Sequence, residues 1–237
     1  MSTQKATADS LSVQRGNYAA SLPGPLLFVA LRTLTVPIQY LILTRSTTLL
    51  PLQPLTLSQT VLIAMPSYIA FKHITWSLTL MRERMTIPFA FFGGLSDLAF
   101  EVLTSYIYTL HPINPTYSPS LLIPGAILNF IGISTELISE IQRYRFKQDS
   151  KNQGKIYTGG LWGVVRNVNY ACNVAFAFGY ASAAGGVLYG MAYSGIYVMN
   201  FVFNAIPGIE AYMKEKYGSQ WEGVERKVKW RLFPGIY

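Results

Sequence analysis

Asp97 and Glu101 are acidic residues in an apolar stretch. They are four residues apart, so a helix would place both carboxyl groups on one face, about one turn apart. Lys72 and His73 lie deep in the preceding apolar stretch. A charge in hydrocarbon costs roughly 2.5–3.5 kcal/mol even on insertion scales, so these side chains must face a protein interior or a wet cavity. Two interpretations follow: a structural pair, Lys72–Glu101 or Arg32–Asp97, or a proton donor at a substrate cavity.

A second group of chemically capable residues surrounds a glycine pair, Gly159–Gly160. Arg166 and Lys147 offer positive charge suited to a pyrophosphate or a 2′-phosphate. Trp162 and Tyr170 offer flat faces on which an adenine or nicotinamide ring can stack. The glycines allow the backbone to approach a ligand closely. These residue types suit a nucleotide, while Arg166 and Trp162 could equally be a positive-inside anchor and an interface aromatic.

The composition is that of a membrane protein. Of the 237 residues, 51% are hydrophobic and 13% are charged, against about 25% charged in soluble domains. The net charge of +8 comes from basic residues beside apolar runs, which favours anionic lipid over nucleic acid as the partner. Two His and one Cys are too few for an ordinary zinc site, so no metal is expected.

The apolar runs predict an all-α, polytopic integral membrane protein with about six transmembrane helices. Each run approaches the roughly 20 residues that a span requires. The last run is too long for one span, and its small residues Ala183–Gly186 predict a tight turn between two helices. The predicted spans are 25–44, 58–80, 88–110, 121–142 and two helices within 171–206.

The basic residues predict the orientation of these spans. With both termini cytoplasmic, 16 of the 19 Lys and Arg residues fall on the cytoplasmic side, as the positive-inside rule requires. Residues 111–120 and about 183–189 then lie on the far side. The cytoplasmic set is Lys5, Arg15, Arg82, Arg84, Arg143, Arg145, Lys147, Lys151, Lys155, Arg166, Lys214, Lys216, Arg226, Lys227, Lys229 and Arg231.

The chain is expected to form one membrane domain, 21–237, after a disordered cytoplasmic tail at 1–20. Within the domain, 21–120 would be the substrate-side helices and 121–237 the cofactor-binding half. The cytoplasmic cofactor loop is accompanied by a C-terminal amphipathic helix, in which apolar residues recur every four positions. These residues are Ile209, Met213, Tyr217 and Trp221.

Three stretches, in order, resemble one membrane-enzyme superfamily. The first is Glu136-x-x-x-Glu140-x-Gln142-x-x-x-Phe146-Lys147, the second runs from Gly159 to Tyr170, and the third comprises Ile206-Pro207-x-x-Glu210, Tyr217-Gly218 and Phe233-Pro234. They are similar to the steroid 5α-reductase C-terminal domain, the sterol C14-reductases and the isoprenylcysteine carboxyl methyltransferases. Asn167 and Val168 replace the His-Pro of the superfamily's R-H-P-N-Y signature.

The resemblance implies NADPH held between the loop and the C-terminal helices, and a location in the endoplasmic reticulum membrane. In the methyltransferase branch, a His and a Glu help to hold S-adenosylmethionine, and Asn167 and Asn173 occupy those places here. This loss counts against methyl transfer more than against reduction. The cofactor-binding residues that the resemblance implies are Glu140, Gln142, Lys147, Trp162, Arg166, Asn169, Tyr170 and Glu210.

The leading hypothesis is therefore an NADPH-dependent reductase of a C=C bond in a lipophilic substrate such as a sterol, terpenoid or polyketide. The substrate would enter from the lipid bilayer, and Glu101 or Asp97 would supply the proton. Three alternatives stay open: a cofactor-independent isomerase or cyclase that uses the intramembrane acids, an S-adenosylmethionine-dependent methyltransferase, and a non-catalytic lipid-binding protein. The oligomeric state is left open.

Overall fold

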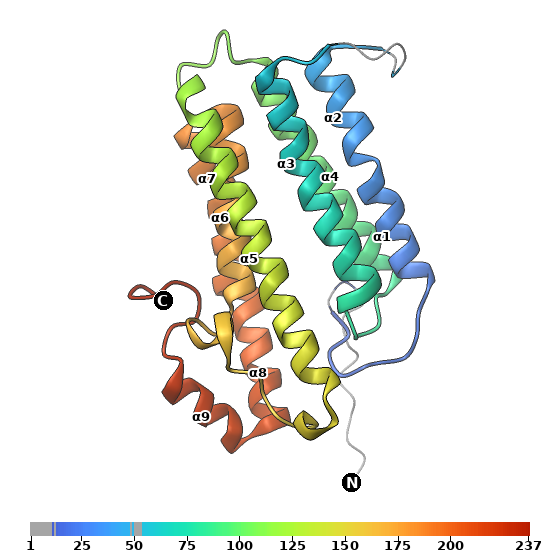
Figure 1. The fold of residues 1–237 in the computed structure, drawn as a ribbon, viewed down its shortest axis with the longest axis vertical. Helices are drawn as coiled ribbons and strands as arrows, with labels where there is room; N and C mark the ends of the chain where they lie inside the picture. The colour runs from blue at the N-terminus through green and yellow to red at the C-terminus, as the bar shows by residue number, and fades with distance from the viewer. Residues whose placement is uncertain (1–10, 12, 48, 50–53) are drawn as a thin grey trace. The chain divides into compact units, whose positions relative to one another are not determined.

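The computed structural model describes residues 11, 13–47, 49 and 54–237, and every regular element in these residues is a helix (Figure 1). The predicted all-α class is thus confirmed for the described part of the chain. The chain divides into two compact units: unit 1 comprises Met1–Thr109 and unit 2 comprises Leu110–Tyr237. Residues 1–10 and 12 of the expected tail lie outside the described residues, and the single membrane domain with its two halves meeting at 120/121 stays a prediction.

Unit 1 is a group of long helices lying side by side (Figure 1). Its first apolar run is interrupted at Leu34, because Pro37 has no N–H to donate to Thr33 and its ring would clash with that carbonyl group in a continuous helix. The start of the next helix is fixed by a capping box, in which Thr56 Oγ1 accepts from Gln59 N at 3.3 Å and Gln59 Oε1 accepts from Thr56 N at 2.9 Å. The helices are α1 (Pro23–Thr33), α2 (Thr35–Thr44), α3 (Leu57–Thr75) with a π turn at Trp76–Leu80, and α4 (Ile87–Thr109).

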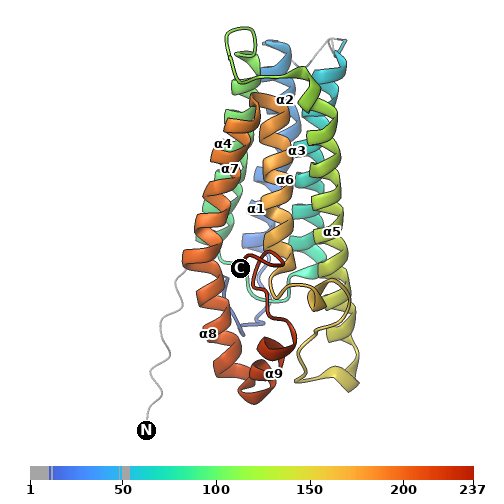
Figure 2. The same cartoon turned by 90° about the vertical axis from the view of Figure 1, so that its left-hand side faces the viewer.

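Unit 2 contains α5 (Leu122–Gln148), α6 (Val168–Gly185) and α7 (Val187–Asn200), followed by α8 (Ile206–Tyr217) and α9 (Ser219–Lys227). Figure 2 shows α8 continuing beyond α7, with α9 at the same end. The predicted tight turn is confirmed at Gly186, which has φ 93° and whose absent Cβ would collide with the Thr116 carbonyl group. The predicted continuous C-terminal helix is wrong, because Gly218 adopts φ 51° and separates α8 from α9.

Three stretches of the described residues are long and apolar enough to cross a membrane: Pro23–Thr44, Ile87–Thr109 and Pro119–Gln148. They make the chain an integral membrane protein. The count of six spans and the cytoplasmic placement of both termini stay predictions.

Helices α5 and α6 pack so closely that their backbones nearly touch. A Cβ on Gly179 would lie 2.5 Å from the Gly125 carbonyl oxygen and 2.8 Å from Asn129 N. Asn129, which is fully buried, adds a side-chain hydrogen bond of 3.0 Å to the carbonyl group of Phe176. Small residues let transmembrane helices approach in this way, and van der Waals contact then holds them together.

We expect Gly179→Ala to destabilise unit 2 by about 1–3 kcal/mol, because the added methyl group overpacks the α5–α6 contact. Gly195→Ala in α7 is the matched control, since nothing lies within 4 Å of the Cβ that it introduces. The control is expected to be neutral or stabilising by up to about 1 kcal/mol, as alanine favours a helix. Thermal unfolding in detergent measures both variants, and equal melting temperatures would contradict the packing argument.

Candidate functional site

The end of α5 and the signature loop, residues 159–170, meet through specific hydrogen bonds in unit 2. Leu161 N donates to Gln142 Oε1 at 3.2 Å. Gly160 has φ 52°, and a Cβ there would run into the Gln142 side chain. Glycine is required at this turn both for its backbone conformation and for this approach. Gln142 thereby positions the loop.

Trp162 is held at the same end of α5. Its Nε1–H donates to the carbonyl group of Ser139 at 2.8 Å. The guanidinium of Arg143 lies 4.8 Å from the centre of the indole ring, and Arg143 also donates to Glu140 Oε2 at 2.5 Å. Glu140 is buried, whereas the side chain of Arg143 is 39% exposed. The result is an aromatic face beside an accessible cation.

Arg166 is the most heavily bonded residue of the loop. Its Nε and Nη2 donate to Glu210 Oε1 at 3.0 and 2.9 Å. Its Nη1 donates to the carbonyl groups of Val228 at 2.8 Å and Lys229 at 3.1 Å. The side chain is only 6% exposed, so these charge-assisted bonds are shielded from water. Arg166 therefore ties the loop to both α8 and the C-terminal segment.

The C-terminal strap, residues 228–237, lies along the signature loop. Backbone N–H groups of Arg166 and Asn167 donate to the carbonyl groups of Trp230 and Arg231 at 2.9 and 3.0 Å, and Asn167 Nδ2 also donates to Arg231 O at 3.0 Å. Arg231 forms an ion pair with Glu210 at 3.1 Å. Burial opposes the charge of Arg231, yet its hydrogen bond to Tyr237 and the carboxylate of Glu210 raise the pKa of this guanidinium.

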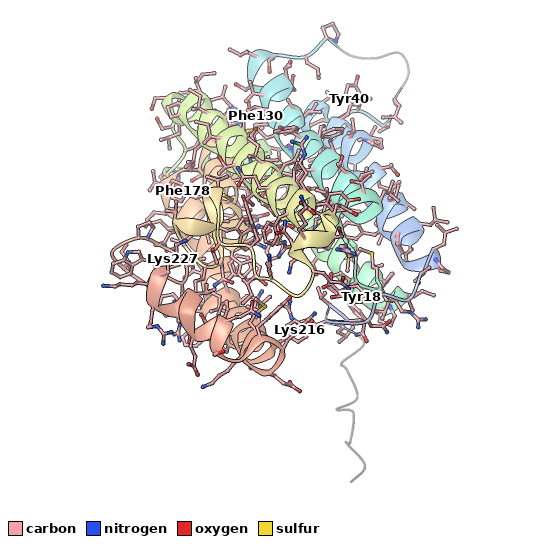
Figure 3. The ribbon with its side chains drawn as sticks, turned by 60° about the horizontal axis from the view of Figure 1, so that its bottom comes forward. Tyr18, Tyr40, Phe130, Phe178, Lys216 and Lys227 are labelled. Atoms are coloured by element: carbon pink, nitrogen blue, oxygen red, sulfur yellow. The ribbon has the colours of Figure 1, made fainter. Side chains whose placement is uncertain are left out.

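The remaining motif residues occupy the flanks of this arrangement. Lys147 Nζ donates to the carbonyl group of Lys155 and, at 3.3 Å, to the Tyr217 hydroxyl group. Tyr170 stacks on Phe201 with ring centres 4.4 Å apart. The carbonyl group of Asn169 accepts from Asn173 Nδ2 at 2.6 Å. In Figure 3, the labelled residues Lys216 on α8 and Lys227 at the end of α9 lie at this same end of unit 2.

Unit 1 holds a separate polar seam between α1–α2 and α4. Arg32 is fully buried and donates to Glu101 through Nη2 at 2.5 Å and Nη1 at 3.3 Å, while Thr35 Oγ1 donates to the same carboxylate at 2.9 Å. One turn further along, Ser105 and Gln39 are hydrogen-bonded to each other. Glu101 thus forms a buried ion pair with Arg32.

Asp97 lies at the more exposed end of this seam. Its Oδ2 is 3.1 Å from His73 Nδ1 and 4.0 Å from Arg32 Nη1. The side chains of Asp97 and His73 are 24% and 14% exposed, whereas Arg32 has no exposed surface. The expected Arg32–Asp97 pair is therefore present only as a long contact, and the dominant partner of Arg32 is Glu101.

The structure brings predicted site residues together in two groups in unit 2: Glu140, Gln142 and Trp162 at the end of α5, and Arg166 with Glu210 beside the C-terminal strap. Sequence reasoning gave no site role to three residues that complete these contacts, nor to His73, which contacts Asp97 in unit 1. Arg143 lies three residues after Glu140 in the sequence, and this spacing predicts an ion pair on one face of a helix. His73 was noted only as a deep residue, and the other two depend on the path of the chain: Arg231 and Ser139.

These features define a membrane protein that is all-helical in its described residues, with a candidate loop-and-tail site in unit 2 and a polar seam in unit 1. The chain belongs to a steroid 5α-reductase-like family, described as "Protein of unknown function (DUF1295)", which matches residues 76–228.

Relatives with assigned names fall into two groups. A protein of Ustilaginoidea virens named "Probable O-methyltransferase ustE" is 30% identical over 235 residues, covering 86% of this chain and 83% of that protein. The Delta(14)-sterol reductase of Ascobolus immersus is 34% identical over 91 residues, or 37% of this chain and 20% of the reductase. The 7-dehydrocholesterol reductase of Danio rerio is 25% identical over 177 residues, 63% of this chain and 36% of the reductase. The match thus spans most of the methyltransferase-named relative but only a minor part of either reductase.

Glu210→Gln is expected to loosen the C-terminal strap, because both Arg166 and Arg231 lose their carboxylate partner. Charge-assisted hydrogen bonds contribute about 1.5–3 kcal/mol, so tryptic cleavage after Lys229 and Arg231 is expected to accelerate roughly tenfold or more. Glu222→Gln, at an exposed position on α9, is the control. Identical cleavage rates in the two variants would remove Glu210 as the residue that holds the strap.

Proposed function

We propose that the protein is a membrane-embedded, NADPH-dependent reductase of a C=C bond in a lipophilic substrate. The observation that supports this most directly is the assembly in unit 2 of the three motif stretches, in which Gln142, Trp162 and Glu210 contact one another's segments. The local likeness to two sterol reductases agrees with it. NADPH, when bound, would supply a hydride.

The residues of unit 2 fit such a cofactor. A phosphate-rich ligand needs cations that it can reach, and Arg143 and Arg231 are 39% and 42% exposed. Trp162 adds a flat apolar face beside Arg143, and Gly160 leaves the backbone open to close approach. Arg166, by contrast, is bound by Glu210 and by the strap, so in this proposal it positions the site.

The proton for such a reduction is proposed to come from an intramembrane acid. Sequence reasoning offered Glu101 and Asp97 for this role. Glu101 accepts hydrogen bonds from Arg32 and Thr35, which gives it a structural task. Asp97 is the more exposed of the two and lies against a histidine, so it is the better candidate.

A methyltransferase is the second candidate, and one observation favours it. The relative named as an O-methyltransferase matches over 83% of its own length, whereas the two sterol reductases match over 20% and 36% of theirs. Against it stand the Asn residues at positions 167 and 173. Their side-chain amides donate to the carbonyl groups of Arg231 and Asn169, and neither supplies the charge or ring that the methyltransferase branch uses.

Calorimetric titration of the detergent-purified protein decides between these two candidates. We expect saturable binding of NADPH and none of S-adenosylmethionine. The reverse result would establish the methyltransferase, and binding of neither would leave only the cofactor-free isomerase, cyclase or lipid-binding alternatives.

Lys147→Met is expected to weaken NADPH binding roughly tenfold or more, because a charge-assisted contact to phosphate contributes about 1.5–3 kcal/mol. Lys151→Met removes an exposed lysine from the neighbouring loop and is the matched control. Comparison of NADPH with NADH separates a 2′-phosphate contact, which only NADPH would lose, from a pyrophosphate contact, which both would lose. Unchanged affinity in Lys147→Met would remove Lys147 from the cofactor site.

A further inference from the structure

The C-terminal strap is joined to the signature loop at the position where the superfamily's signature has a histidine. Asn167 occupies that position and is only 5% exposed. Its backbone N–H and its side-chain Nδ2 both donate to the carbonyl group of Arg231, each at 3.0 Å. One residue of the loop thus makes two hydrogen bonds to one residue of the strap.

Asn167 is also the residue that precedes the first turn of α6. An Asn side chain in that position ordinarily accepts a hydrogen bond from the backbone of the helix. Here the side chain makes no such bond, and its amide donates to the strap instead. The carbonyl group of Asn167 still accepts from the N–H groups of Tyr170 and Ala171, both at 3.1 Å, so the helix begins normally. The side-chain amide therefore serves the strap and not the helix.

The strap is itself a folded segment. Leu232 is buried and packs with Phe201 and Ile206. The N–H groups of Leu232 and Phe233 both donate to the carbonyl group of Tyr237, at 2.8 and 3.1 Å. A segment that is anchored by a buried side chain and by its own hydrogen bonds can hold a neighbouring loop in one place.

A small apolar cluster carries this restraint further into the loop. Val165 and Val168 stand on either side of the bonded residues Arg166–Asn167, and both are buried in one cluster with Cys172. Trp162 packs against the same cluster. Because the strap fixes the backbone of residues 166 and 167, it also fixes the surface on which the Trp162 indole rests. The cluster therefore connects the strap to the end of α5, which Trp162 contacts.

We propose that Asn167 is a positioning residue: it holds the strap on the signature loop, and the strap in turn holds Trp162 beside Arg143. This inference rests on the proposed function in one respect, namely that the face formed by Trp162 and Arg143 receives NADPH. Attachment of the strap and binding of the cofactor are then coupled. The coupling is reciprocal, so bound NADPH also stabilises the attached strap.

Asn167→Asp separates the attachment of the strap from the start of α6. A carboxylate cannot donate to the Arg231 carbonyl group, yet Asp is as favourable as Asn at the start of a helix. Asn204→Asp, at an exposed position in the π turn Phe201–Ala205, is the matched control. Leu232→Ala loosens the strap without any change at Asn167, so it tests the same coupling even where Asn167→Asp folds poorly.

The chain has four tryptophans, which make the coupling measurable. In protein labelled with 5-fluorotryptophan, ¹⁹F NMR gives a signal for each indole, and Trp162→Phe identifies that of Trp162. In ligand-free protein, Asn167→Asp and Leu232→Ala are both expected to shift the Trp162 signal. Asn167→Asp is also expected to accelerate tryptic cleavage after Lys229 roughly fivefold, the equivalent of one ordinary hydrogen bond. Asn204→Asp is expected to change neither measurement.

Two results on the ligand-free protein would overturn the proposal. Faster cleavage with an unmoved Trp162 signal would show that the strap and the loop are independent. Unchanged cleavage in Asn167→Asp would show that Asn167 does not hold the strap.

NADPH provides a separate measurement. We expect Asn167→Asp to bind NADPH roughly fivefold more weakly than the parent, and NADPH to slow cleavage of the parent after Lys229. Equal affinity in the two proteins would show that the strap does not serve the cofactor, and the proposal would fail. No binding of NADPH by the parent would remove the proposed function, whereas the ligand-free measurements would still decide whether Asn167 couples the strap to Trp162.

Discussion

A charged side chain inside an apolar helix bundle must be neutralised where it lies, and this constraint shapes unit 1. Arg32 has no exposed surface, so α4 has to bring a carboxylate to it, and Glu101 meets it at 2.5 Å. Because Asp97 and Ser105 stand one turn to either side of Glu101, the pairing fixes the rotation of α4 and its height along α1 and α2. Removal of either partner would leave a buried charge, which costs more than the pair itself contributes.

The same need to neutralise charge also holds the C-terminal strap in place in unit 2. Glu210 is shared by Arg166 and Arg231, and these two arginines come from the signature loop and the C-terminal strap. One carboxylate on α8 therefore joins three segments far apart in the sequence. The arginine of the signature is already occupied in joining these segments, so contacts to the phosphate groups of the proposed cofactor would fall to cations that remain accessible, such as Arg143.

Much of the fold could be predicted from the sequence, and the predictions that were wrong or incomplete have physical reasons. Apolar run length placed the helices, and small residues placed the turn at Gly186. The spacing of Asp97 and Glu101 showed that they share a face, but spacing along one helix cannot reveal which residue on another helix is the partner. The break at Gly218 was missed because a four-residue apolar repeat continues through it, and the backbone conformation of one glycine overrides that pattern.

The family match begins at Trp76. It includes most of the contacts described in unit 2 but only part of the polar seam in unit 1. The motif contacts of unit 2 up to Val228 lie within the matched residues, as do Asp97 and Glu101. Arg32 and His73 lie before them. The seam in unit 1 is thus assembled from carboxylates inside the match and basic partners outside it. The part of the chain that the family match covers therefore does not by itself specify the Arg32–Glu101 pair.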